Sequence, residues 1–324
     1  MNKLYNLYKK LFSENTSSEN EYHVINLPDM PDHKLGMSED FCPIFFIKCC
    51  DNPKSSDIKL KNLEVKFNKE CILVDDSSNT KTKESYSLIS LNSYQQELQM
   101  YFIEIVNMLL LEIHGLPTIQ QLNSEIFKLV ELFEDSPSTS IEVIRGLWAE
   151  LFVILKSNNP EYLIKSWHVS PNDKFDFNDG IDKIEVKSTS NPCHSHIFSL
   201  EQLNPGATSK LVIASVFVIQ VGIGKNLLEL ADQIINKIND VDAKDKVRKI
   251  ILKTVGSQFD KIREYYFDYS TAEDNYAIYD YSVVPKIPFD LIPKEVTQVH
   301  FRSNLTNVPQ LAKEKYIGKL HNSL

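Results

Sequence analysis

Residues 175–188 read FDFNDGIDKIEVKS, and this stretch carries the strongest structural signal in the chain. In an extended strand alternate side chains share a face, so Glu185 and Lys187 point the same way while the residue between them turns into the core. Asp179-Gly180 is typical of a tight turn, which folds the segment with Asp176 back beside the strand with Glu185. Two carboxylates then flank one ammonium group, an arrangement that can hold a hard divalent cation and a water beside a phosphate.

A helix is predicted directly upstream, where residues 138–155 read STSIEVIRGLWAELFVIL. The apolar residues recur with helical period, and Thr139 and Glu142 have the spacing of a capping box. Glu150 is a lone acid inside this apolar stretch. Two structural alternatives stay open for Glu150, because an acid in such a helix can also extend to the surface or pair with a neighbour such as Arg145.

The spacing Asp176-(x8)-Glu185-x-Lys187 resembles the motif of the PD-(D/E)XK nuclease superfamily, the fold of many restriction endonucleases. In that superfamily a helix before the motif strands often donates a glutamate to the metal site, and Glu150 occupies that place. Over residues 138–222 the order of elements also resembles the bacterial "PD-(D/E)XK motif protein" family, whose members are associated with restriction-like phage defence clusters. The resemblance implies an α/β (α+β) fold, with a restriction endonuclease-like core of a mixed sheet flanked by helices.

The resemblance also implies an activity, which is metal-dependent hydrolysis of phosphodiester bonds by a DNA endonuclease that forms no covalent intermediate. Asp176 and Glu185 are expected to bind Mg²⁺ or Mn²⁺, with the backbone carbonyl of Val186 as a further ligand. Lys187 is expected to orient the attacking water or to stabilise charge on the phosphate. Glu150 is expected to recruit a second ion or a metal-bound water.

Two more polar residues are candidate substrate contacts. Gln202 follows the strand of Lys187 and is expected to reach a water or a phosphate, as polar residues there do in the superfamily. Capping a helix near Ser199 is the structural alternative for Gln202. Ser188 continues the strand and either contacts phosphate or completes a hydrogen-bond ladder.

The charged candidates also have alternative assignments. The glutamate and lysine of the motif can form an ordinary pair on a solvated strand face. Asp176 has three rivals as the metal ligand, which are Asp173, Asp179 and Asp182. Asp173 lies in a Pro-Asn-Asp turn sequence and Asp179 precedes the turn glycine, so Asp176 is the preferred ligand.

The chain divides into four predicted segments. Residues 1–92 form a β-rich module after a short amphipathic helix, and residues 93–137 form a helical connector that packs on the core. Residues 138–225 form the nuclease-like core, and residues 226–324 form a C-terminal helical region with late strands. Helices are expected over residues 93–115 and 118–133, and strands over residues 22–27, 44–47, 58–60, 71–74, 86–89, 276–281 and 296–301, with an exposed loop at 75–81.

The charge of the chain is not that of an autonomous DNA-binding protein. The 324 residues carry 35 Lys and Arg against 44 Asp and Glu, a formal net charge of −9, whereas DNA-binding domains usually present a basic surface. The acid is concentrated in residues 1–137, which hold 13 basic and 21 acidic residues, while residues 138–225 hold 8 and 9. We therefore expect a protein partner to supply DNA recognition.

The resemblance to defence proteins implies which partners to expect. They are an ATPase or helicase and a methyltransferase of a restriction-like anti-phage system, in which the chain acts as the nuclease subunit. The alternative from another class is a catalytically weak or inactive nuclease-fold protein that serves as an interaction or DNA-docking subunit, which the acidic N-terminal module favours. A homodimer is compatible with double-strand cleavage, and the oligomeric state stays open.

The sequence also indicates a cellular compartment. No apolar run approaches the length of a membrane span, and the N-terminal residues are amphipathic and unlike a signal peptide. The five cysteines, two of them adjacent at Cys49 and Cys50, do not form a disulfide framework. We expect a cytoplasmic protein, without membrane contact, in a reducing compartment.

Overall fold

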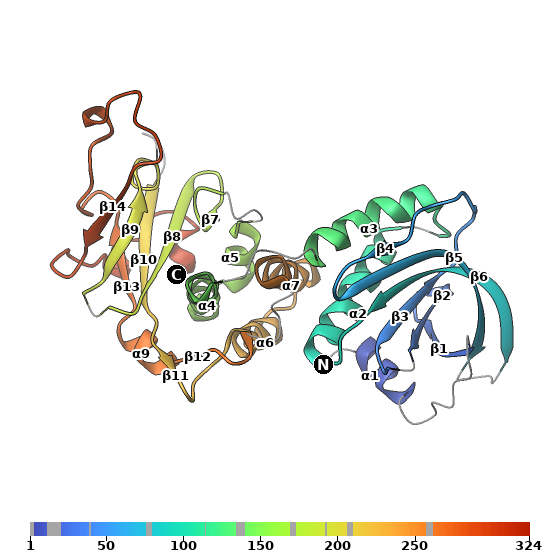
Figure 1. Ribbon diagram of the computed structural model, residues 1–324. Coiled ribbons are helices and arrows are strands. Elements are labelled where there is room, and N and C mark those ends of the chain that lie inside the picture. The colour runs from blue at the N-terminus through green and yellow to red at the C-terminus, as the bar shows by residue number, and fades with distance from the viewer. Residues whose placement is uncertain are drawn as a thin grey trace. The chain divides into compact units, whose positions relative to one another are not determined.

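The structure is a computed structural model that describes residues 3–11, 21–38, 40–75, 80–113, 115–133, 140–168, 173–191, 193–205, 210–256 and 262–324. The chain forms two compact units, Met1–Pro137 and Ser138–Leu324 (Figure 1). The finer division into four segments stays a prediction. Among the described residues, no helix is long and apolar enough to cross a membrane.

The N-terminal unit contains helix α1 (Lys3–Lys10) and a six-stranded sheet. The strand order is β1 (Glu21–Leu27), β2 (Met30–Met37), β3 (Pro43–Ile47), β6 (Lys81–Leu91), β5 (Leu63–Asp75) and β4 (Ile58–Lys59). β1 also pairs in parallel with β5, so five of the strands form a closed ring. The five strands expected in this region are confirmed. The expected loop at 75–81 joins β5 to β6, and residues 76–79 lie outside the described part of the chain.

β2 has the weakest strand signal in this sheet, because it contains Pro31, Asp32 and Gly36. Its glycine has a packing reason. A Cβ at Gly36 would lie 2.9 Å from the backbone oxygen of His23 and 2.9 Å from the ring of Phe46. Only a residue without a side chain therefore lets β2 pair between its two neighbours.

Two helices complete the N-terminal unit, α2 (Gln96–Glu112) and α3 (Ile119–Phe133), and both confirm the helices expected there. The ring of Phe102 on α2 packs edge-on against Phe45 of β3, with 5.8 Å between the ring centroids. The same ring meets Phe133 of α3 at 6.2 Å. Phe102 is fully buried, so aromatic packing fixes α2 against the sheet and α3.

The C-terminal unit is built on a mixed four-stranded sheet. Its strand order is β13 (Ala277–Asp280), β10 (Lys210–Phe217), β8 (Asp182–Thr189) and β7 (Phe177–Asn178). β8 and β10 pair in parallel, whereas β7 and β13 are antiparallel to their neighbours. Every residue of β10 after Lys210 is buried, as expected for a central strand that is covered on both faces. The expected α/β fold with a mixed sheet is confirmed.

Short strands form two further pairs in the described part of this unit, and one of the pairs lies against the main sheet. β9 (Ser195–Ser199) pairs with β14 (His300–Asn304), and β11 (Gln220–Val221) pairs with β12 (Tyr266–Phe267). Phe198 of β9 packs in one buried cluster with Ile213 of β10 and Tyr279 of β13. The face of the main sheet that carries Ile213 is therefore the face that lies against β9.

Helices make up the rest of the C-terminal unit: α4 (Ile141–Lys156), α5 (Pro160–Ser166), α6 (Leu227–Lys237), α7 (Val241–Val255) and α9 (Tyr269–Asp274), with short 3-10 turns at Phe289–Leu291, Lys313–Lys315 and His321–Ser323. α4 packs against β8 and α6 (Figure 1). Its N-cap is Ser140, which accepts a hydrogen bond from the backbone N–H of Val143. Thr139, the predicted capping residue, lies outside the described residues.

The two late strands differ in how well the sequence predicts them. The strand expected at 276–281 is confirmed as β13. The strand expected at 296–301 is wrong in its position, because β14 begins only at His300 and continues to Asn304. Gln298 has a φ of 57°, in the left-handed region, and this conformation interrupts an extended chain.

Candidate active site

The β7–β8 hairpin aligns the two acidic segments of the motif. Phe177 pairs with Ile184 across the hairpin, as the turn signal predicts. The Asp179 carboxylate accepts hydrogen bonds from the backbone N–H groups of Ile181 at 3.0 Å and Asp182 at 2.8 Å. Gly180 has a φ of 94°, which favours glycine. Asp179 therefore holds the turn and is not directed at the site.

Asp176 lies directly before β7 and reaches across to β8. Its Oδ2 atom accepts a hydrogen bond of 2.6 Å from the backbone N–H of Val186. Among its rivals, Asp173 is exposed and Asp182 is buried against Gly318. Of these aspartates, Asp176 is the one whose carboxylate contacts the Glu185–Lys187 segment of the strand.

Glu185, Lys187 and Gln202 form a closed ring of hydrogen bonds. The Oε1 atom of Glu185 accepts from Lys187 Nζ at 2.8 Å and from Gln202 Nε2 at 2.5 Å. Lys187 Nζ also donates to Gln202 Oε1 at 3.1 Å. The exposed fraction is 4% for the Glu185 side chain and 19% for the Lys187 side chain, which excludes the alternative of a solvated strand face.

Gln202 follows β9 and lies on the face of β8 that β9 covers. The backbone N–H of Ser199 donates to Gln202 Oε1 at 3.0 Å, so the amide is held from behind while it contacts Glu185 and Lys187. The backbone N–H of Gln202 in turn donates to the Ser199 hydroxyl at 3.2 Å, which is a capping contact of the turn that follows β9. Ser188 is half-buried and, by strand alternation, faces the opposite side of β8 from Lys187. The structure does not bring Ser188 together with the other candidates.

Glu150 enters the site from α4. Its Oε2 atom accepts a hydrogen bond from Trp167 Nε1 at 2.5 Å and lies 2.9 Å from His168 Nε2. These contacts direct the carboxylate inward instead of toward Arg145 or the surface. Trp167 is itself buried, so the direction of the Glu150 side chain is fixed by packing as well as by hydrogen bonding.

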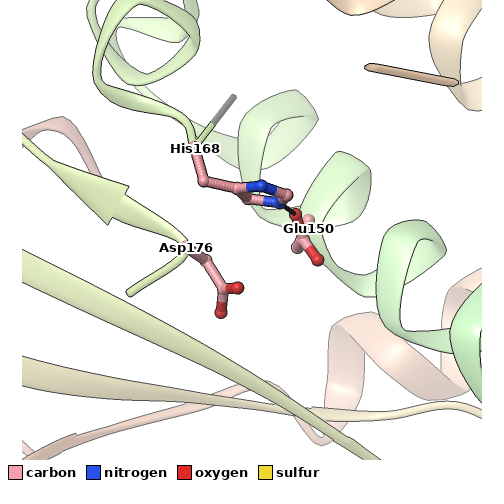
Figure 2. A group of neighbouring side chains, drawn as sticks. All are labelled: Glu150, His168 and Asp176. Atoms are coloured by element: carbon pink, nitrogen blue, oxygen red, sulfur yellow. Dashed lines mark hydrogen bonds and ion pairs between the residues drawn. The ribbon is translucent and has the colours of Figure 1, made fainter. Parts of the chain in front are cut away.

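The sequence interpretation missed His168. Trp167 forms an antiparallel bridge with Phe177, and the backbone N–H of His168 donates to the carbonyl of Asp176 at 2.8 Å. One ligand-type atom each from Glu150, His168 and Asp176 lies within 4.8 Å of the others, and Figure 2 shows the three side chains gathered around one space. The signal that could have found His168 is the Pro171-Asn172-Asp173 turn sequence, which indicates that the chain reverses between His168 and Asp176.

Burial and mutual repulsion disfavour the charged forms of the carboxylates in this site. Burial, followed by the negative charges of Glu185 and Glu150, raises the pKa of Asp176 well above its usual range, against the Val186 N–H and Lys187. Burial also raises the pKa of Glu185, although Lys187 opposes this shift. The second oxygen of Glu185, Oε2, is buried without a hydrogen-bond partner. Oxygen donors with an unpaired buried oxygen among them fit a divalent cation, because the ion satisfies that oxygen and offsets the clustered negative charge.

Comparison with known proteins adds one match. A family model described as "Putative PD-(D/E)XK family member, (DUF4420)" matches residues 6–306. No curated protein and no solved structure matches the chain. The match extends over both units and includes every residue of the site described above.

Proposed function

The chain belongs to the PD-(D/E)XK family whose model spans residues 6–306, and we propose that it is a metal-dependent DNA endonuclease that hydrolyses phosphodiester bonds. The observation that carries this proposal is the convergence of Asp176, Glu185 and Lys187, with the Glu185 side chain buried and the Lys187 side chain mostly buried. A protein that only docks DNA or another subunit has no need to hold these charges together inside the protein.

The proposed metal ligands are the carboxylates of Asp176, Glu185 and Glu150 and the backbone carbonyl of Val186. They are hard oxygen donors, and Mg²⁺ or Mn²⁺ is the ion that such donors prefer. A bound ion would polarise the scissile phosphate and lower the pKa of a water. The Oε2 atom of Glu185 is buried without a hydrogen-bond partner, so it is available as a donor atom for an ion, and this supports the assignment.

Lys187 is the proposed group that handles the water and the phosphate. Glu185 and Gln202 fix its ammonium from two sides, so the remaining N–H can donate to a phosphate oxygen or to the attacking water. A charge held in a mostly buried position acts on the transition state without having to reorient, which makes it more effective than a mobile lysine. The proposed reaction is direct attack of water on phosphorus, without a covalent intermediate. Ser188 faces the opposite side of β8 from Lys187 and has no role in this reaction.

The proposed setting is a restriction-like anti-phage system in the bacterial cytoplasm. The acidic N-terminal segment and the net charge of −9 support dependence on partners for DNA recognition, with an ATPase or helicase and a methyltransferase as the expected classes. A homodimer with one site in each chain would permit double-strand cleavage.

The experiment that tests the function is cleavage of supercoiled plasmid by the purified chain with Mg²⁺ or Mn²⁺. We expect metal-dependent nicking that falls by about 10³-fold or more in Lys187→Ala and Glu185→Gln. Lys183→Ala is the matched control and should retain nicking. Lys183 lies two residues before Glu185, on the same face of β8 as Glu185 and Lys187. Equal nicking by wild type and Lys187→Ala would defeat the proposal, as would a folded wild type that binds no metal and cleaves nothing.

A further inference from the structure

We propose that His168 is a metal ligand, and that its Nε2 atom with the carboxylates of Glu150 and Asp176 forms a nitrogen-containing metal position beside Glu185. Asp176 would be shared between this position and the one that Glu185 and the Val186 carbonyl supply. The inference rests on the proposed function, because it extends the metal site of that nuclease. It adds a ligand of a different chemical type, an imidazole, to a set of oxygen donors.

The geometry is the first support. One ligand-type atom of each residue lies within 4.8 Å of the others, a spacing that a single ion can bridge with small side-chain movements. The three residues come from α4, from the segment after α5 and from the segment before β7, and Figure 2 shows His168 in contact with Glu150 and Asp176 beside them. The backbone bond from His168 N–H to the Asp176 carbonyl, at 2.8 Å, keeps two of the three side by side.

The hydrogen bonds of Glu150 are compatible with a change of partner by His168. Glu150 Oε2 accepts from both Trp167 Nε1 and His168 Nε2. If His168 Nε2 turns to an ion, the indole N–H of Trp167 still satisfies that oxygen. Trp167 would then act as the outer partner that orients a ligating carboxylate, an arrangement that metal sites commonly use.

The second, independent support is the buried carboxylate of Glu185. Its Oε2 atom is buried without a hydrogen-bond partner, and its side chain is more than nine-tenths buried. The negative charge of Glu185 acts on Asp176, and the charges of Glu150 and His168 act on Glu185, so all four side chains belong to one electrostatic site. Three carboxylates share this site with the single ammonium of Lys187, which pairs with Glu185, and this excess of negative charge is what a cation would neutralise.

The imidazole has a consequence for which ion binds. Mg²⁺ prefers oxygen ligands and retains several waters, whereas imidazole nitrogen is a good ligand for first-row transition ions. A site made only of carboxylates gives little preference for Mn²⁺ over Mg²⁺. We therefore expect His168 to make this chain bind Mn²⁺ more tightly than a site with oxygen donors alone.

The test is electron spin echo envelope modulation of Mn²⁺ bound to the full chain, because this signal reports ¹⁴N in direct contact with the ion. The wild type is compared with His168→Gln, whose amide can keep a hydrogen bond to Glu150, and with His300→Gln, a control at an exposed histidine. We expect ¹⁴N modulation in the wild type and the control, its loss in His168→Gln, and a Mn²⁺ affinity about 10- to 100-fold lower in that variant.

The outcomes separate this inference from the function. Mn²⁺ bound to the wild type without ¹⁴N modulation, or modulation that persists in His168→Gln, overturns the role of His168 as a ligand. If either result is found and the wild type cleaves plasmid, the nuclease proposal survives and His168 only positions Glu150. A folded wild type that neither binds Mn²⁺ nor cleaves plasmid overturns both proposals.

Discussion

In the N-terminal unit, lysines pair with acids at the surface. The side chains of Lys48 and Glu84 are each 39% exposed, and those of Lys83 and Glu70 are 63% and 65% exposed. Within the described part of this unit, every Asp, Glu, Lys and Arg is at least partly exposed. In the C-terminal unit the Lys187–Glu185 pair lies inside the protein, with 19% and 4% of the two side chains exposed.

The exposed ion pairs of the N-terminal unit and the buried pair of the C-terminal unit differ in what they cost the folded state in free energy. An exposed ion pair contributes about 0–1 kcal/mol and costs little to keep. A buried pair loses its hydration, and apolar residues of similar volume are often at least as stabilising. Adding Asp176 and Glu150 to the same site increases the repulsion, as the raised pKa of Asp176 indicates. We infer that the C-terminal unit retains these charges for chemistry and not for stability.

The largest effect on cleavage is expected from a change at Asp176, which the β7–β8 hairpin places beside Val186. Asp176→Asn should lower metal-dependent plasmid cleavage by about 10³-fold or more, because a neutral amide is a poor ligand for a divalent ion. Asp173→Asn, at an exposed position in the same segment, should keep wild-type cleavage. The opposite ranking of the two variants would show that the wrong aspartate has been assigned.

A smaller effect is expected from the residue that orients the charges. Gln202→Ala should lower the cleavage rate by about 10- to 100-fold, as loss of a supporting contact typically does. The reason is that Gln202 contacts both Glu185 and Lys187, at 2.5 and 3.1 Å. Gln220→Ala is the control, since Gln220 is exposed on β11. Unchanged cleavage in Gln202→Ala would mean that Lys187 is held well enough without the amide.

The raised pKa values predict how metal binding depends on pH. Asp176 and Glu185 must lose their protons to bind an ion, and both have pKa values above their usual range. Mn²⁺ affinity should therefore rise with pH, by up to about tenfold per unit for each proton displaced below the raised pKa. Calorimetric titration at pH 6, 7 and 8 measures this slope. A pH-independent affinity would argue that the ion binds elsewhere.

The smallest effect is expected in the N-terminal unit. A double-mutant cycle on Lys83→Ala and Glu70→Ala, followed by urea unfolding, should give a coupling free energy of about 0.2–1 kcal/mol. The two side chains are more than 60% exposed although their atoms approach to 2.6 Å. A coupling well above 1.5 kcal/mol would weaken the contrast between the two units.

Local sequence rules were sufficient for the central part of the site. Strand alternation places Glu185 and Lys187 on one face, and the Asp179-Gly180 turn pairs β7 with β8, so Asp176 could be predicted to reach β8. The same rules predicted most strands and helices of both units. They worked because each relation depends on residues that are close together in the sequence.

Relations that depend on tertiary packing could not be predicted in this way. His168 reaches Asp176 because Trp167 forms a bridge with Phe177; the turn sequence at residues 171–173 indicates a reversal of the chain, but no local rule gives the register of that bridge. The strand at 296–301 was displaced because the backbone of Gln298 is left-handed, which its side chain does not signal. Burial of the Glu185–Lys187 pair depends on β9 and on Gln202, which the chain brings over β8 from the following segment.

The most direct test of the account is thermal unfolding of the wild type and of Asp176→Asn at pH 8, with a chelator and with saturating Mn²⁺. Because the folded-state pKa of Asp176 is raised, the native state binds more protons than the unfolded state, and stability falls as pH rises from the unfolded pKa through the raised one. At pH 8, above the unfolded pKa of an aspartate, the wild type without metal carries a cost of this kind, which the asparagine removes.

We therefore predict that the order of stability reverses with metal. With the chelator, Asp176→Asn should melt about 2–4 °C above the wild type, the shift expected for about 1 kcal/mol in a domain of this size. With Mn²⁺ the wild type should melt above the variant, because only it binds the ion tightly. If the wild type is the more stable protein under both conditions, or if Mn²⁺ changes neither protein, the buried charges are not a metal site.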